Sequence, residues 1–419
     1  MPIVRAKTAA LVSRVHDARS AVNSRASSTA TLLVTYGGLR TVLFPIPIIT
    51  IFWKDQIGMS LTDIMLLQAI FSFAAVLFEF PSGYAADRLG RRTSLLIASV
   101  LWIAGWVLYS LGTTFTGMIA AEVVLGGGIA FASGADSALL FTALQETDRT
   151  AEYPRWEGRL RAAAQSSEAM SAALGGYLYS LSPRLPFWLQ LPFAMAALGT
   201  ATAMRESPRG HAVERVSHLV QAWRIIRNTL LHHARLRTAV VLSVTLSLST
   251  FVMVWLIQPY MQSRGIPEPW FGPLWAFASL YLASMSLLSA RAAERVGRNV
   301  VLFVCCLLIA IGYGALAVSS AASAVAFYLC FMTIRGLQAP LLIAVLQRDA
   351  PGDARASVLS LNALVFRLGF VLVGPPVGML VDRLGMQTAL AILGGVFFTA
   401  ALVTFSAFRR AHSHPSASE

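Results

Sequence analysis

The chain has 419 residues, of which 56% are hydrophobic and only 13% are charged. A soluble domain carries about 25% charged residues, so this composition excludes a soluble enzyme, a disordered chain and a collagen-like fibre. The formal net charge of +13 must then belong to a protein whose outer surface is apolar, which is typical of a protein that crosses a membrane many times.

Twelve apolar segments follow one another along the chain, each near the ~20 residues that a helix needs to cross a bilayer. None shows the short alternating pattern of an outer-membrane barrel strand. We therefore expect an all-α membrane protein with twelve spanning helices. The predicted spans are 31–52, 64–86, 94–111, 117–140, 160–181, 187–204, 238–261, 271–290, 300–318, 322–346, 358–381 and 388–408.

The long polar segments lie before the first span, between the sixth and seventh, and at the end of the chain. The first is basic, and we interpret it as a cytoplasmic arm, although an organelle transit peptide has a similar composition. In the second, Leu219, Trp223, Ile226 and Leu230 recur at helical spacing, which predicts an amphipathic helix on the inner membrane surface; a solvated linker is the alternative. The predicted division into arm, first half, linker, second half and tail is 1–30, 31–204, 205–237, 238–408 and 409–419.

The 33 Lys and Arg residues are distributed unequally between the two sides of this topology. Only Lys54, Arg184, Arg264 and Arg383 fall in segments on the side opposite the amino terminus. This bias places both termini in the cytoplasm, with the protein in the plasma membrane and, for a bacterium, the inner membrane. The bases are spread over many segments, so we expect no nucleic-acid partner.

A short motif follows the second span, where residues 83–92 read G-Y-A-A-D-R-L-G-R-R. Residues 290–299, A-R-A-A-E-R-V-G-R-N, repeat it after the eighth span, as expected for a transporter with internal repeats. The first copy resembles the cytoplasmic signature of the major facilitator superfamily, between helices two and three. The resemblance implies two pseudo-symmetric six-helix bundles.

The same resemblance implies a conformational latch at the inner ends of the helices. In the family the acid and the base of the motif cluster with an acid of the fourth helix, and this cluster stabilises the outward-facing state. An ordinary patch of inner-loop charges is the alternative. The residues that match the latch are Gly83, Asp87, Arg88, Gly90, Arg91 and Asp136.

Two features of the fourth and fifth helices depart from the family pattern. Glu122 precedes the glycines of the fourth helix, where the family usually has an Arg, and the fifth helix lacks the proline of the exporter signature. The sequence therefore leaves the direction of transport and the coupling residue open. Gly126, Ala130 and Gly134, spaced four apart, predict a close-packing helix face.

Charged residues inside spans are costly and indicate function. Arg40, Arg335 and Arg367 lie near the predicted bilayer centre, where guanidinium groups can hold an anionic or zwitterionic group, and Tyr36 lies one turn before Arg40. We expect these four residues to bind substrate. Since all seven histidines lie outside the spans, any proton step at depth needs a carboxylate.

Glu168, near the bilayer centre, and Glu122, nearer the outer side, are the expected proton-coupling carboxylates. A structural ion pair between Glu168 and an arginine is the alternative. We expect a monomeric secondary active transporter, not an enzyme, that exports a small organic or amphipathic molecule in exchange for protons. Uptake or exchange of a small organic anion, bound by the arginines, is the alternative. The sequence predicts no catalytic residue, metal site or cofactor.

Overall fold

The computed structural model describes residues 28–206, 233–351 and 355–413, and these residues are helical apart from short connections. No strand occurs within them, so the prediction of an all-α fold is confirmed. Most of the predicted arm and the amphipathic part of the predicted linker lie outside the described residues. The predicted tail is helical up to residue 413, because α15 continues past residue 408.

The amino-terminal half begins with a helix over residues 28–40, and a short 3-10 turn, η1 (Thr150–Glu152), precedes α7. Its remaining helices are α2 (Ile49–Gln56), α3 (Leu61–Arg88), α4 (Arg91–Leu111), α5 (Phe115–Ala132), α6 (Ala135–Gln145), α7 (Tyr153–Leu181) and α8 (Leu185–Ala203).

The carboxy-terminal half contains six long helices, with the 3-10 turns η2 (Glu268–Trp270) and η3 (Ala322–Phe327) between them. The helices are α10 (Ala234–Ser263), α11 (Phe271–Val296), α12 (Arg298–Val318), α13 (Tyr328–Asp349), α14 (Arg355–Leu384) and α15 (Met386–Ser413).

Nine helical stretches of the described residues are long and apolar enough to cross a membrane. They coincide with nine of the twelve predicted spans. The other three predicted spans correspond to the interrupted helix over residues 28–56 and to α7 and α8. The interrupted helix is too short in each part to span by itself, and α7 begins with several charged residues.

Two of the predicted spans are broken rather than continuous. The first span is interrupted between residue 40 and Ile49, where Pro45 and Pro47 lack the backbone N–H groups that a continuous helix needs. The fourth is interrupted at Gly134, whose φ of 73° is left-handed and favours glycine. The predicted packing face therefore keeps Gly126, where a Cβ would lie 3.1 Å from the Phe71 carbonyl oxygen, but does not extend to Gly134.

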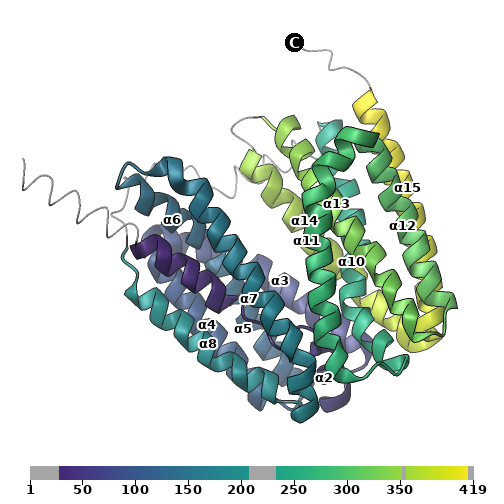
Figure 1. Cartoon of the computed structure of the whole chain (residues 1–419), viewed down its shortest axis with the longest axis horizontal. Coiled ribbons are helices and arrows are strands. Elements are labelled where there is room, and N and C mark those ends of the chain that lie inside the picture. Colours follow the sequence, from purple (N-terminus) through teal and green to yellow (C-terminus); the bar gives the residue numbers. More distant parts are fainter. Residues whose placement is uncertain (1–27, 207–232, 352–354, 414–419) are drawn as a thin grey trace, which may run out of the picture.

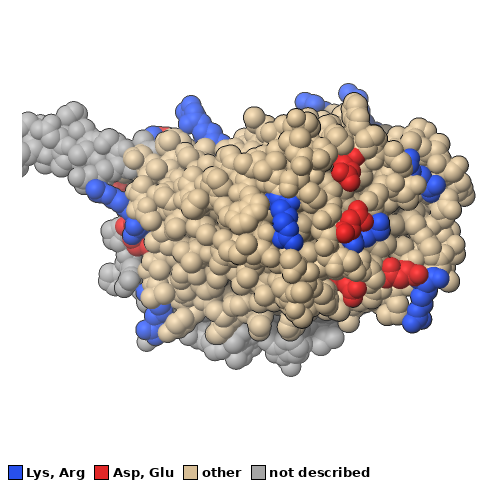
Figure 2. Space-filling view, turned by 90° about the horizontal axis from the view of Figure 1, so that it is seen from below, with Lys and Arg blue, Asp and Glu red and all other residues tan. Residues whose placement is uncertain are grey.

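The two halves meet at one end of the molecule and separate toward the other, where α6 and the start of α14 lie (Figure 1). We call the end where they meet, formed by α2, the start of α3 and the end of α14, the closed end. There α3 packs along α14, and α7 packs along α11. Seen from this end, the charged side chains are few and lie among residues that carry no charge (Figure 2).

Glycines allow the helices of the two halves to approach at the closed end. A Cβ on Gly378 of α14 would collide with the backbone of Leu61, where α3 begins. On the other side of the molecule, a Cβ on Gly176 of α7 would collide with the carbonyl oxygen of Glu268 in η2. Backbone contact of this kind between helices requires small residues, and it seals the closed end.

Candidate functional site

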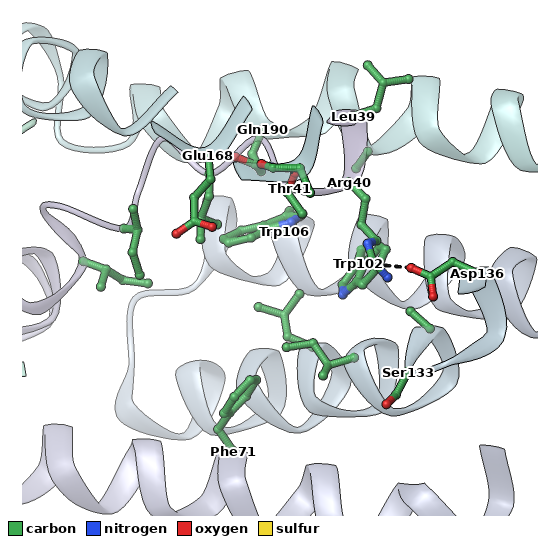
Figure 3. Close-up of a pocket in the computed structure, with 18 of the residues that line it drawn as sticks. Leu39, Arg40, Thr41, Phe71, Trp102, Trp106, Ser133, Asp136, Glu168 and Gln190 are labelled. Carbon is green, nitrogen blue, oxygen red and sulfur yellow. Dashed lines mark hydrogen bonds and ion pairs between the residues drawn. The ribbon is translucent and has the colours of Figure 1, made fainter. Parts of the chain in front are cut away.

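A cavity of about 730 Å³ lies mainly within the amino-terminal half and is bounded by Phe251 and Trp255 of α10 in the other half. It extends to Glu157 and Arg161 near the start of α7, away from the closed end. Figure 3 shows aromatic and charged side chains gathered around it. Of the predicted site residues, Arg40, Glu122, Asp136 and Glu168 line this cavity.

Arg40 and Asp136 form an ion pair at the wall of the cavity, with 3.2 Å between Nη2 and Oδ2 (Figure 3). Both helix breaks contribute to this geometry. Arg40 is the last helical residue before the first break, and Asp136 lies in the first turn of α6 after the second. Cations are favoured at the carboxyl end of a helix and anions at the amino end. The two interruptions therefore create the places where these charges are stable.

Aromatic rings support the Arg40 side chain on its other faces. Its guanidinium lies 5.4 Å from the ring centre of Trp102 and 5.9 Å from that of Tyr36, within the range of cation–π attraction. Tyr36 is fully buried, and its hydroxyl donates to the Leu95 carbonyl oxygen at 3.3 Å. Tyr36 is not among the residues that line the cavity, so the structure places it behind Arg40.

Glu122 is a buried carboxylate with neutral partners. Its Oε1 accepts hydrogen bonds from Nε2 of Gln68 (3.1 Å) and from the hydroxyl of Tyr109. Only 4% of Glu122 is exposed, and it has no ion pair within the described part of the chain. Burial of an ionised carboxylate is costly without a cation, and protonation removes that cost.

Glu168 lies on the same cavity from α7 (Figure 3). It accepts a hydrogen bond from Nε2 of its neighbour Gln165 at 3.2 Å, and among the described residues it forms no ion pair. The expected alternative of a structural pair between Glu168 and an arginine is therefore not present in this conformation.

The acids that line the cavity outnumber the bases. Arg40 is paired with Asp136, and Arg161 is paired with Glu157 at 2.7 Å. Glu122 and Glu168 remain without cations inside the described structure. The formal charge of the lining is therefore negative, whereas the sequence suggested an excess of buried arginines.

Arg335 and Arg367 do not join Arg40. They lie on α13 and α14, are half-buried, and are absent from the lining of this cavity. Neither forms an ion pair with another described residue. The structure thus does not bring together the three arginines that were expected to hold an anionic or zwitterionic group, and a role for Arg335 and Arg367 stays a prediction.

The motif at residues 83–92, which spans the end of α3 and the start of α4, holds the amino-terminal half together. Arg91 donates to the Ala138 carbonyl oxygen on α6 at 2.6 Å and to the Thr142 hydroxyl. The guanidinium of Arg88 lies over the ring of Tyr84, and Gly90 has a φ of 101°. Gly83 has open space around it, and Asp87 lies on α3.

Asp136 is the latch residue whose described contacts differ from the expectation. It was expected to face the motif, but its carboxylate is paired with Arg40, and Arg91 contacts α6 at Ala138 and Thr142, two and six residues further on. The positive end of a new helix holds Asp136 at the cavity, which a continuous fourth helix would not do. The latch function itself stays a prediction.

Several residues that cap the motif or line the cavity were not predicted from the sequence. Glu206 caps α4, accepting from the backbone N–H groups of Arg91 (3.0 Å) and Arg92 (2.9 Å), although it falls in the predicted linker. Gln68 and Gln190 line the cavity, as do Trp102 and Trp106. Glutamines are rare inside apolar spans, so Gln68 and Gln190 could have been identified from the sequence as candidate site residues. Tryptophans are too common in such spans to be identified in this way.

Two helical halves that meet at one end, beside a charged cavity at membrane depth, form the architecture of a membrane carrier. Residues 30–374 match the sequence pattern of the Major Facilitator Superfamily, and the chain belongs to this family of transporters. The expectation drawn from residues 83–92 is thereby confirmed.

The curated relatives are similar over part of the chain. The quinolone resistance protein NorA of Staphylococcus aureus is 20% identical over 164 residues, which are 39% of this chain and 41% of NorA. The multidrug resistance protein 1 of Bacillus subtilis is 25% identical over 179 residues, 42% of this chain and 44% of that protein. The matched segment thus spans less than half of either relative.

Solved structures of the same architecture cover nearly the whole chain. The nucleoside transporter NupG superposes with a TM-score of 0.73 at 14% identity, covering 92% of this chain and 99% of NupG. A D-xylose-proton symporter also superposes with a TM-score of 0.73, at 15% identity, covering 93% and 99%. At these identities the likeness concerns the fold.

Proposed function

We propose that this protein is a secondary active transporter that exports an amphipathic aromatic cation in exchange for protons. The observation that carries the proposal is the cavity lining, in which the carboxylates of Glu122 and Glu168 have no cation partner among the described residues and lie among aromatic rings. The cavity extends away from a closed end that joins the two halves. This arrangement suits alternating access, in which the halves rock about a site near the middle of the membrane.

The lining favours a cation over an anion. Four indole rings, those of Trp53, Trp102, Trp106 and Trp255, contribute to it, and an aromatic face attracts cations. Of the three arginines expected to bind substrate, only Arg40 lines this cavity, and its charge is already neutralised by Asp136. The lining therefore gives little support to transport of an organic anion, the alternative drawn from the sequence.

Glu122 is the proposed proton carrier. The carboxylate is buried with only neutral hydrogen-bond donors, so either a proton or a bound cation in the cavity can offset its charge. If the two compete for the same negative charge, the site releases one when it takes the other. Competition of this kind produces exchange of substrate for protons.

We propose export as the direction of transport because the relatives are described as resistance proteins. NorA is described as a quinolone resistance protein, and the Bacillus subtilis relative as a multidrug resistance protein. A transporter confers resistance when it lowers the internal concentration of the compound. The same direction suits a proton gradient directed into the cell.

The test is transport of ethidium, an aromatic cation, into proteoliposomes that contain a DNA oligomer, so that ethidium fluoresces on entry. With an acidic lumen, the wild-type protein should accumulate ethidium well above the level of protein-free vesicles. Glu122→Gln should abolish the dependence on the pH gradient, and Glu168→Gln should weaken ethidium uptake. Glu146→Gln, which changes an exposed carboxylate outside the cavity lining, is the matched control and should behave as the wild type.

Absence of ethidium transport by folded wild-type protein would contradict the proposal. Transport of the anionic dye fluorescein that is lost in Arg40→Ala would favour the anion alternative instead.

A further inference from the structure

The break in the first helix is held by two glutamine side chains, one from each half of the molecule. Gln190 of α8 accepts from the backbone N–H of Phe44 at 3.3 Å and donates to the carbonyl oxygen of Val42. Gln258 of α10 accepts from the N–H of Thr50 at 2.8 Å and donates to the carbonyl oxygen of Ile46 at 2.9 Å. Both glutamines are buried.

The two backbone groups that Gln258 binds belong to Ile46 and Thr50, which are four positions apart in the sequence. In a continuous helix the N–H of Thr50 would donate to the carbonyl oxygen of Ile46. The amide of Gln258 is inserted into this missing bond and satisfies both groups, a known cause of helix interruption. Because Gln258 is fully buried, water cannot easily replace it while the halves are in contact.

The two glutamines differ in what happens when the halves separate. Gln190 lies in the same half as the break and should move with it. Gln258 belongs to the other half, and it lies at the closed end, one turn before Gln262. Gln262 accepts from Nζ of Lys54 (2.8 Å) and donates to Asp55 Oδ2 (2.5 Å). Opening of the closed end must therefore remove Gln258 from the first helix.

We propose that Gln258 is a positioning residue that couples the closed end to the cavity. While the closed end is shut, its amide keeps the first helix broken and holds Arg40 opposite Asp136. When the halves part, Thr50 and Ile46 lose this partner, and the break must change shape. The inference rests on alternating access as proposed above, but its test is a distance measurement that needs no substrate.

The experiment is pulsed electron paramagnetic resonance between nitroxide labels at the closed end, one on each half. Exposed serines in the connections before α8 and before α13, Ser182 and Ser320, are replaced by cysteine. The three native cysteines, Cys305, Cys306 and Cys330, are replaced by alanine. In this background Gln258→Ala should increase the long-distance, open population several-fold.

Gln190→Ala is the matched control, because it removes an equivalent pair of hydrogen bonds from the same segment without crossing the halves. It should leave the distance distribution unchanged, although it lowers the melting temperature. Gln258→Asn, too short to bridge the two backbone groups, keeps an amide in the core in case Gln258→Ala does not fold, and it should also shift the distribution.

A distance distribution unchanged in both folded Gln258 variants, or shifted equally by Gln190→Ala, would overturn the proposal. Failure of ethidium transport would leave these distances unaffected, so the two proposals fail separately.

Discussion

Arg40 shows how a single residue in this protein depends on two elements. It ends one helical segment, and its partner Asp136 begins another. The pair therefore exists only because both helices are interrupted. Its side chains keep 19% and 9% of their surface exposed, so the pair is mostly but not fully desolvated.

Replacement of Arg40 by alanine should leave Asp136 buried without a cation. Loss of one partner of a fully buried pair costs roughly 3–5 kcal/mol, and we expect about 2 kcal/mol here because of the residual exposure. The double variant Arg40→Ala with Asp136→Ala should recover part of this loss, since no charge remains uncompensated. Thermal unfolding of the purified variants measures both effects, and strictly additive losses would contradict the coupling.

Arg40→Lys should not restore the wild-type protein. Lysine keeps the charge but cannot stack a planar group on Trp102 or bind Asp136 in the same geometry. We expect ethidium transport by Arg40→Lys to be reduced about tenfold, which corresponds to about 1.4 kcal/mol in the barrier. Wild-type transport by this variant would show that charge alone suffices.

The sequence identified individual charges at this scale but not their partners. Arg40, Glu122, Asp136 and Glu168 were recognisable because charged residues are rare within apolar spans. Their pairing depends on where the helices break, and the predicted first and fourth spans, 31–52 and 117–140, are continuous. Arg40, Arg335 and Arg367 outnumber Glu168 near the predicted bilayer centre, whereas the lining of the cavity contains more carboxylates than guanidinium groups.

At the scale of elements, close helix crossings close one end of the molecule. Gly378 brings α14 against the start of α3, and the carboxylate of Asp382, four residues on, accepts from the backbone N–H groups of Leu61 (3.1 Å) and Thr62 (2.8 Å). A carboxylate of one half is thus bound at the amino end of a helix of the other, where its charge is favoured. This contact is possible only when the backbones are close.

Gly378→Val should therefore prevent the closed end from shutting. The added side chain would collide with the backbone of Leu61 and Thr62, which cannot move aside cheaply. Gly199→Val on α8 is the matched control, because nothing lies near that glycine. Label distances between Ser182 and Ser320 should lengthen in Gly378→Val only; an unchanged distance would contradict the role of this crossing.

The positions of the helix breaks were only partly predictable, because they depend on contacts between residues that are distant in the sequence. Prolines 45 and 47 are visible in the sequence, but a proline can bend a helix or interrupt it. Interruption was favoured here because Gln190 and Gln258 satisfy the exposed backbone groups, and these residues are distant in sequence. Only the folded structure brings them together.

At the scale of the whole molecule, hydropathy and length predicted the order of the spans, and nine of the twelve predicted spans coincide with described helices that are long and apolar enough to cross a membrane. The family followed from one short motif and its repeat, and the match over residues 30–374 agrees. The contacts between the halves could not be derived in this way, because apolar helices carry little information about which neighbour they choose. The side of the membrane to which the closed end faces stays a prediction from the distribution of basic residues.

The predicted orientation places the closed end outside the cell. Single cysteines at the exposed positions Ser182 and Ser320 should react with a membrane-impermeant maleimide on intact cells, whereas a cysteine at Ser413 should react only after permeabilisation. The native cysteines are replaced in all three variants. Labelling of Ser413→Cys on intact cells would reverse the orientation.

Exchange of an aromatic cation for protons is the central claim, and proton movement driven by the substrate tests it most directly. Proteoliposomes contain a pH-sensitive dye, with potassium and valinomycin on both sides to hold the membrane potential at zero. Ethidium added outside should make the lumen alkaline as protons leave, at a rate that falls to that of protein-free vesicles in Glu122→Gln. Ethidium entry through the wild-type protein without any change in lumen pH would contradict the account.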